Sequence, residues 1–312
     1  MRDVIRQNSV FLAFTAEYRL PIALPAFLTD AIAMSPLRPI LLLLSLLTVA
    51  GWVHGTDTPP SRVVSINLCT DQLLLMLADA DQIASVSYLS LQPESSFVAE
   101  EAKRYPVNHA RPEELLALNP DLILTVEFTD RRLLGLLEKL GYRIAQLPMP
   151  TSINGIENNI LRLAELLGQP ARGAALIHEM RSALSQIPLQ PANQRPKALF
   201  YQPRGYTSGS GTLQNETLAL AGWSNLATKL GISGYSSIDL ESLLLGQPDQ
   251  IFTSTYTGET RSLAQRQLHH PALRRITHNR PIIEIPFKYW ICGGPMIADA
   301  VAELHAALPM KP

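Results

Sequence analysis

Cysteine and charge are scarce in this sequence. Its 312 residues include two cysteines, Cys69 and Cys292, and no closely spaced set of Cys and His side chains. A zinc site built from thiolates needs more ligands than these, so no such site is predicted. Charged residues make up 17% of the chain, and the formal net charge is −1. A nucleic-acid partner requires a basic surface that neutralises phosphates, and none is therefore expected.

Motifs of common enzymes are missing as well. The sequence has no Gly-x-Ser-x-Gly elbow, no His-Glu-x-x-His pair and no phosphate-binding loop. The glycine-rich stretch Gly209-Ser210-Gly211 lacks the lysine and the spacing that such a loop needs. We therefore expect no catalytic residue, no metal held by the protein itself and no cofactor.

One apolar run lies near the N-terminus. Residues 40–50 are almost wholly apolar, follow a short charged segment that begins at Met34 and precede small residues, which is typical of a secretory signal. The run is shorter than the roughly 20 apolar residues of a membrane span. We expect residues 34–55 to be a cleaved signal peptide, with an uncut anchor as the alternative, and residues 1–33 to be a mis-assigned extension. The mature protein is then periplasmic.

After this signal, strand patterns alternate with helical patterns, which predicts an α/β fold with parallel sheets. The expected strands are residues 62–66, 83–86, 121–125, 143–147, 197–201, 250–253 and 282–285. Shorter helices are expected at residues 72–78, 112–119, 131–140, 214–221, 239–245 and 295–308. Apolar residues then recur at helical spacing over two longer stretches, residues 153–167 and 170–187. The predicted organisation is a first lobe at 62–168, a linker helix at 169–188 and a second lobe at 196–312.

The two predicted lobes contain a similar segment. The stretch 113–124, Glu-Glu-Leu-Leu-Ala-Leu-Asn-Pro-Asp-Leu-Ile-Leu, resembles 240–251, Leu-Glu-Ser-Leu-Leu-Leu-Gly-Gln-Pro-Asp-Gln-Ile. Both have the pattern of a short helix, a Pro-Asp pair and an apolar strand. The repeat supports two lobes that are built alike.

The chain resembles the helical-backbone class of periplasmic binding proteins, which serve cobalamin, ferric-siderophore and haem importers. The resemblance is carried by residues 62–75, 111–124 and 213–226 and by the repeated Leu-Glu at Leu240. It implies two Rossmann-like lobes with parallel sheets, joined by a single long backbone helix, with a ligand cleft between them. It also implies a monomer that binds a metal chelate and passes it to an ABC permease dimer. Glu113 and Glu241 are the glutamates that the resemblance implies for docking on the permease.

The loops that follow the strands are the candidate walls of the cleft, because ligands of open parallel sheets bind beyond the carboxyl ends of the strands. Aromatic rings in these loops offer a large and rigid contact area. Arginine and lysine side chains there could meet ligand carboxylates or an anionic ferric chelate. The predicted ligand-binding residues are Asn67, Cys69, Thr70, Tyr88, Phe128, Arg204, Tyr206, Thr207, Tyr256, Lys288, Tyr289, Trp290 and Cys292.

The two cysteines leave three alternatives open. Each precedes a predicted helix on the cleft side, one in each lobe. A disulfide between them would tie the lobes together, as an oxidising compartment permits. Two thiolates could instead meet a soft metal or ligand atom, or both side chains could simply pack as small residues.

Two rival classes also stay open. One is a secreted α/β enzyme or metal-handling enzyme of similar two-lobed shape. The other is a periplasmic adaptor that binds only proteins, which would carry an exposed apolar patch.

Overall fold

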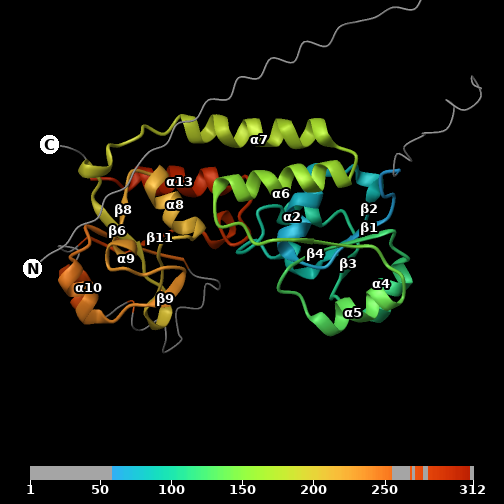
Figure 1. Cartoon of the computed structure of the whole chain (residues 1–312), viewed down its shortest axis with the longest axis horizontal. Helices are drawn as coiled ribbons and strands as arrows, with labels where there is room; N and C mark the ends of the chain where they lie inside the picture. The colour runs from blue at the N-terminus through green and yellow to red at the C-terminus, as the bar shows by residue number, and fades with distance from the viewer. Residues whose placement is uncertain (1–57, 255–267, 269–270, 277–279, 310–312) are drawn as a thin grey trace, which may run out of the picture. The chain divides into compact units, whose positions relative to one another are not determined.

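The computed structural model describes residues 58–254, 268, 271–276 and 280–309, which are drawn in colour in Figure 1. The described residues all belong to one compact unit. The predictions of a signal peptide at 34–55 and an extension at 1–33 lie outside the described residues. Within the described part of the chain, no helix is both long enough and apolar enough to span a bilayer.

The first lobe contains a five-stranded parallel sheet with the order β3-β2-β1-β4-β5. Its strands are β1 (Val63–Ser65), β2 (Ile83–Ser87), β3 (Val107–Asn108), β4 (Leu122–Val126) and β5 (Ile144–Leu147). Its helices are α2 (Leu68–Leu77), α3 (Ala99–Ala102), α4 (Pro112–Leu118) and α5 (Arg131–Lys139), with 3₁₀ turns at Ala80–Gln82 and Tyr88–Leu91. Strand order and helix placement are those of a Rossmann-like sheet.

Successive residues of the central strands enter different cores, as the period of two in a strand requires. Val63 and Leu122 belong to the large core that α2 and α6 (Ile153–Leu166) cover, whereas Val64 and Ile123 join a smaller core beside α4 and α5. Both faces of the sheet are therefore covered, and its strands are apolar on both sides.

The second lobe repeats this plan with four parallel strands in the order β11-β10-β6-β8. These strands are β6 (Lys197–Phe200), β8 (Ser224–Asn225), β10 (Gln250–Thr253) and β11 (Ile283–Glu284). A separate antiparallel ribbon pairs β7 (Tyr206–Ser208) with β9 (Tyr235–Ser237). The helices are α8 (Leu213–Leu220), α9 (Leu226–Lys229), α10 (Leu240–Gly246), α12 (Pro271–Ile276) and α13 (Ile297–Ala306), with 3₁₀ turns at Ala192–Gln194, Pro203–Gly205 and Phe287–Tyr289.

The two lobes share one apolar core. Helix α7 (Pro170–Ser185) packs on α6 and on α13, and Figure 1 shows it running along both. The large core contains residues of the first lobe, of α6 and α7, and of the second lobe, including Leu163, Met180 and Val301. The linker helix predicted at 169–188 thus corresponds to α7, and α6 and α13 join it in connecting the lobes.

The equivalent helices α4 and α10 end in the same way. Each stops at a residue in the left-handed region, Asn119 with φ 44° and Gln247 with φ 48°, followed by a Pro-Asp pair. Left-handed residues commonly terminate helices, although glycine is the usual choice. The repeat that the sequence predicts is therefore present in the backbone itself.

Hydrogen bonds around the Pro-Asp pair are also duplicated. The Asp121 carboxylate accepts from the Arg62 N–H at 3.0 Å, and the Asp249 carboxylate accepts from the Lys197 N–H at 2.7 Å. The cationic side chains of Arg62 and Lys197 donate to carbonyl groups at the ends of α4 and α10, at 2.6 and 2.7 Å. Cations are favourable at the negative end of a helix. This arrangement fixes both helices at matching positions in the two lobes.

Helices α6 and α7 approach each other closely at Gly173. A methyl group at this position would lie 2.5 Å from the Ala164 Cβ atom, far inside normal contact distance.

Gly173→Ala should therefore lower the free energy of unfolding by about 1–3 kcal/mol through overpacking. Gly135→Ala, on α5, is the control because its added methyl group would meet nothing within 4 Å. This change should raise the free energy of unfolding by about 0.5–1 kcal/mol. Urea unfolding of both variants measures the difference, and equal stabilities would contradict the packing described here.

Candidate functional site

A cavity of about 680 Å³ lies between the two lobes. Loops at the carboxyl ends of β4 and β5 form its wall on the first lobe, through Glu127, Phe128, Met149, Pro150 and Thr151. Segments after β6, β10 and β11, the β7–β9 ribbon and the start of α8 form the opposite wall. Their lining residues are Gln202, Pro203, Tyr206, Thr207, Ser208, Leu213, Gln214, Tyr235, Ser254, Phe287, Trp290, Ile291 and Gly293. The cavity is thus located where parallel strands of both sheets end, as expected for a ligand site.

Aromatic side chains line the cavity from both lobes. Phe128 of the first lobe is 79% exposed, and Tyr206 and Tyr235 of the second lobe are 53% and 66% exposed. Trp290 is buried behind them, with its ring stacked 4.6 Å from Phe200. Large exposed rings are costly to leave in water, and they become favourable contacts when a flat or apolar ligand covers them.

Polar groups between these rings are held in place by hydrogen bonds. The Trp290 indole N–H donates to the Ser254 hydroxyl at 2.9 Å, and the Tyr235 hydroxyl donates to Gln214 Oε1 at 2.9 Å. Although most of the Tyr235 ring is exposed, desolvation around its hydroxyl raises the pKa of Tyr235 above its ordinary value, and the hydrogen bond with Gln214 opposes the shift. The cavity therefore offers oriented hydroxyl and amide groups to a ligand, beside the Glu127 carboxylate, which accepts from the Met149 N–H at 3.0 Å.

Four of the predicted ligand-binding residues line this cavity, namely Phe128, Tyr206, Thr207 and Trp290. They come from the loop after β4, from β7 and from the segment after β11. The Thr207 hydroxyl donates to the Phe200 carbonyl oxygen at 2.6 Å, so its side chain holds the ribbon against β6. A fifth predicted residue, Tyr256, lies outside the described residues.

Four other predicted residues lie away from this cavity, and each makes local contacts. The Asn67 side chain caps α2 by accepting from the Cys69 N–H at 2.9 Å, and Asn67 lines a separate crevice on the first lobe. Thr70 is fully buried, where its hydroxyl bonds to Ser65, so it offers no surface to a ligand. Tyr88 stacks on His109 at 4.9 Å, and the Tyr289 ring lies 6.1 Å from that of Phe97.

The two predicted cations also lie away from the cavity lining. Arg204 is an exposed residue with φ 64°, in a turn that precedes the ribbon. The Lys288 ammonium group lies 5.7 Å from the centre of the Tyr289 ring and interacts with Asp299 and Glu303 of α13. Burial raises the pKa of both carboxyl groups, and the charge of Lys288 partly opposes this shift. Contact of these two cations with a ligand stays a prediction.

Several cavity residues were missed by the sequence analysis. Met149 to Thr151 follow β5. They would have been found if the rule that loops after strands form the cleft had been applied to the strand at 143–147 as well. Tyr235 belongs to a strand of three residues, too short to give a clear alternating pattern. Gln214, at the start of α8, has no sequence signal that separates it from other helix residues.

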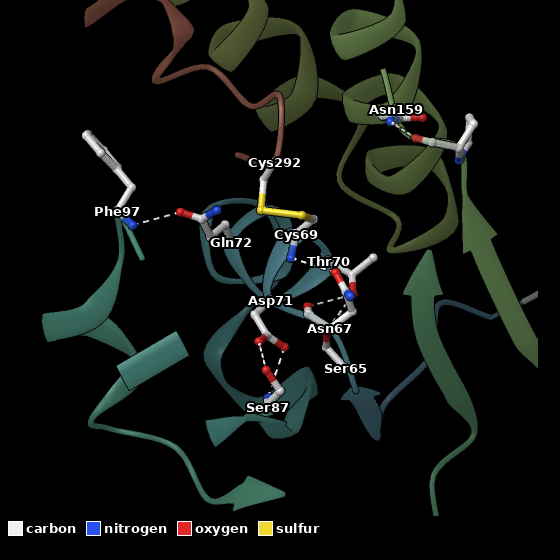
Figure 2. The surroundings of a disulfide bond; sticks show 11 residues. Ser65, Asn67, Cys69, Thr70, Asp71, Gln72, Ser87, Phe97, Asn159 and Cys292 are labelled. Atoms are coloured by element: carbon white, nitrogen blue, oxygen red, sulfur yellow. Dashed lines mark hydrogen bonds between the residues drawn. A yellow bond between two sulfur atoms is a disulfide. The ribbon is translucent and has the colours of Figure 1, made fainter. Parts of the chain in front are cut away.

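The sulfur atoms of Cys69 and Cys292 form a disulfide between the two lobes. Figure 2 shows the bond joining the beginning of α2 to the segment that follows β11. The two Cα atoms are 4.8 Å apart although the residues are separated by 223 positions in sequence. Ile291 and Gly293, the neighbours of Cys292, both line the cavity. The first of the three alternatives for the cysteines is the one that the structure contains.

Two further contacts fix the lobes beside the disulfide. The Glu216 carboxylate, on α8, accepts from the Ile153 N–H at 3.0 Å and so caps α6 from the opposite lobe. Gly293 lies so close to Pro150 that a Cβ atom there would be 2.4 Å from the proline Cγ. The two lobes are therefore packed tightly at Gly293, where a larger side chain would not fit.

Replacing both cysteines should weaken the fold. The bond closes a very long loop, and loss of such a bond costs about 2–5 kcal/mol of the free energy of unfolding. We expect the Cys69→Ser/Cys292→Ser variant to unfold at lower urea concentration than the oxidised protein. Wild-type protein kept in a thiol reductant is the matched control and should unfold like the variant. Identical unfolding of oxidised wild-type protein and variant would contradict a stabilising bond.

A buried carboxyl group, Asp71, lies two residues after Cys69. It accepts from the Ser87 N–H at 3.0 Å and from the Ser87 hydroxyl, which connects α2 to the end of β2 (Figure 2). Burial raises its pKa from the ordinary 3.8 to about 7, although the hydrogen bonds from Ser65 and Ser87 oppose the shift. Asp71 is thus protonated in a large fraction of molecules near neutral pH.

This shift predicts a pH dependence of stability. The folded protein holds the Asp71 proton more tightly than the unfolded chain does, so the free energy of unfolding falls as pH rises from 3.8 to about 7. Each pH unit in that window costs up to about 1.4 kcal/mol. Asp71→Asn, which resembles the protonated acid, should remove this contribution, whereas Asp81→Asn, at an exposed position, should retain it. Urea unfolding at pH 5 and pH 7 measures the slope, and an unchanged slope in Asp71→Asn would contradict the assignment.

Glu113 and Glu241, the predicted docking residues, occupy equivalent places. Each lies in the first turn of its helix, α4 or α10, and each is exposed. Among the described residues, no group of three His, Cys, Asp or Glu side chains is arranged to hold a metal ion.

Comparison with known proteins gives relatives that are named as binding proteins. The chain is 26% identical over 265 residues to a vitamin B12-binding protein of Photorhabdus laumondii, covering 83% of this chain and 92% of the relative. It is 26% identical over 206 residues to a cobalamin-binding protein of Halobacterium salinarum, covering 63% of this chain. The chain spans 54% of the length of that archaeal relative. These names are not those of enzymes, in agreement with the prediction that the chain is not one.

Solved structures support the fold. The periplasmic haem-binding protein HutB of Vibrio cholerae superposes with a TM-score of 0.66 at 20% identity, covering 80% of this chain and 99% of that one. The haem-binding protein RhuT of Roseiflexus sp. RS-1, in its apo form, gives 0.64 at 23% identity, covering 79% and 98%. The predicted two-lobed α/β fold is confirmed. The profile of the periplasmic binding protein family matches residues 63–289, and the chain therefore belongs to that family.

Proposed function

We propose that the chain is the periplasmic solute-binding component of an ABC importer for a metal chelate, such as a ferric siderophore, cobalamin or a haem-like ligand. The observation that carries this proposal is the cavity between the lobes, which aromatic rings line from both sides. Its volume of about 680 Å³ lies within the usual range of small-molecule sites.

The chemistry of the cavity suits a large flat or macrocyclic ligand. Phe128 approaches from the first lobe, and Tyr206 and Tyr235 approach from the second, so a ligand is contacted on two sides. Hydroxyl and amide groups between the rings can fix its orientation at a lower desolvation cost than charged groups would. A chelate brings its own metal, so the protein needs to supply no metal ligand.

The placement of Glu113 and Glu241 supports docking on a permease. Both carboxylates are exposed on helices held by the same hydrogen-bond pattern in the two lobes. A permease dimer presents two equivalent surfaces, and two equivalent carboxylates could each meet an arginine there. In this proposal the protein delivers the chelate as a monomer that spans both permease subunits.

A pair of tyrosine variants tests the ligand site. Tyr206 lines the cavity, whereas Tyr88 is a comparably exposed tyrosine outside it. We expect Tyr206→Ala to raise the Kd for the bound chelate about tenfold or more, because one aromatic wall is lost, and Tyr88→Ala to leave it unchanged. Fluorescence quenching by cyanocobalamin, ferrichrome and haemin provides the measurement.

Three results would count against this proposal. If wild-type protein binds none of the three chelates, the metal-chelate function is wrong. If Tyr88→Ala weakens binding as much as Tyr206→Ala does, or if both variants bind like wild type, the ligand does not occupy the cavity between the lobes.

A further inference from the structure

A second crevice of about 610 Å³ lies entirely on the first lobe. Its walls come from the ends of the neighbouring strands β1 and β4 and from α4 and α5. The chain runs from β1 outward through β2 and β3 on one side of the sheet, and then through β4 and β5 on the other. The gap between β1 and β4 is therefore the topological switch point, where open α/β sheets bind ligands.

This crevice adjoins the cavity between the lobes. Phe128 lines both spaces, and its ring is 79% exposed. Leu136 of α5, which lines the crevice, is also 41% exposed. A ligand in the inter-lobe cavity can therefore extend past Phe128 over an apolar surface that is otherwise left in water.

Two opposite charges line the crevice. The Asp130 carboxylate caps α5 by accepting from the Arg132 N–H at 2.7 Å, and its remaining lone pairs can accept further hydrogen bonds. No carboxylate of the described residues lies within salt-bridge distance of the Arg132 guanidinium group. Asp130 accepts hydrogen bonds and Arg132 donates them, so an uncharged group that does both, such as a carboxamide, satisfies the two together.

We infer that the switch-point crevice is a second subsite, which binds an amide-bearing arm of the chelate held between the lobes. The inference rests on the proposed function, because the crevice receives only the arm of a ligand whose body occupies the main cavity. It makes Arg132 and Asp130 determinants of specificity. They favour chelates with neutral amide substituents over those whose periphery carries only carboxylates.

The test uses cyanocobalamin, whose ring periphery carries primary amides, and compares two adjacent arginines. Arg131 and Arg132 are both exposed on α5, and only Arg132 lines the crevice. Arg131→Gln and Arg132→Gln remove the same charge, so any long-range electrostatic effect is common to both. We expect Arg132→Gln to raise the Kd about tenfold, as loss of a charge-assisted hydrogen bond does, and Arg131→Gln to change it less than twofold. Hydrogen exchange should also show that cyanocobalamin protects residues 128–136 in wild-type protein and protects them less in Arg132→Gln.

The contrary outcomes are distinguishable. If Arg132→Gln binds cyanocobalamin as strongly as wild-type protein does, the subsite is overturned and the proposed function stands. The same holds if cyanocobalamin binds wild-type protein but leaves residues 128–136 unprotected. Binding of haemin or ferrichrome without binding of cyanocobalamin would likewise overturn the subsite alone. Failure of wild-type protein to bind any of the three chelates would overturn the proposed function, and the subsite with it.

Discussion

The covalent bond between Cys69 and Cys292 is the constraint on which the geometry of the site depends. It joins the first turn of α2 to the segment that lines the cavity in the second lobe. The Glu216 cap on α6 and the close contact between Gly293 and Pro150 also join the two lobes. Because the large apolar core contains residues of both lobes, the lobes are held together by packing and by a covalent bond.

We expect a cavity held in this way to be largely formed before a ligand arrives. Binding then orders few side chains and requires little rearrangement of the lobes, which lowers the entropic cost of association. A proposed chelate would enter through the open side of the cavity, between the exposed rings of Phe128, Tyr206 and Tyr235. Because the disulfide opposes a wide separation of the lobes, release of the chelate to a permease would require a local conformational change within the lobes.

Much of the fold could be predicted from the sequence. The β-branched run at Val63, the apolar strand after Pro120 and the helical period from Pro170 each gave an element close to its observed bounds. Those signals are local, because they depend on the alternation or periodicity of neighbouring residues. The ribbon of β7 and β9 escaped prediction because each strand has three residues and pairs only with the other.

The site was less predictable because a loop position does not specify where its side chain points. Thr70 turns inward to bond with Ser65, and Lys288 turns toward the carboxylates of α13. Both were expected in loops, whereas Thr70 lies in the first turn of α2 and Lys288 lies in the 3₁₀ turn at Phe287–Tyr289. The pairing of Cys69 with Cys292 depends on how two lobes approach each other, and residues 223 positions apart carry no local signal of it.

Native mass spectrometry of the protein purified from its own periplasm, with and without reductant, tests the central claim most directly. We expect a co-purifying metal chelate of about 0.5–1.5 kDa, and the larger chelates in this range would extend beyond the cavity. We also expect a protein mass about 2 Da lower without reductant, as for one disulfide. A protein that carries no chelate and gains none from a panel of chelates would contradict the account.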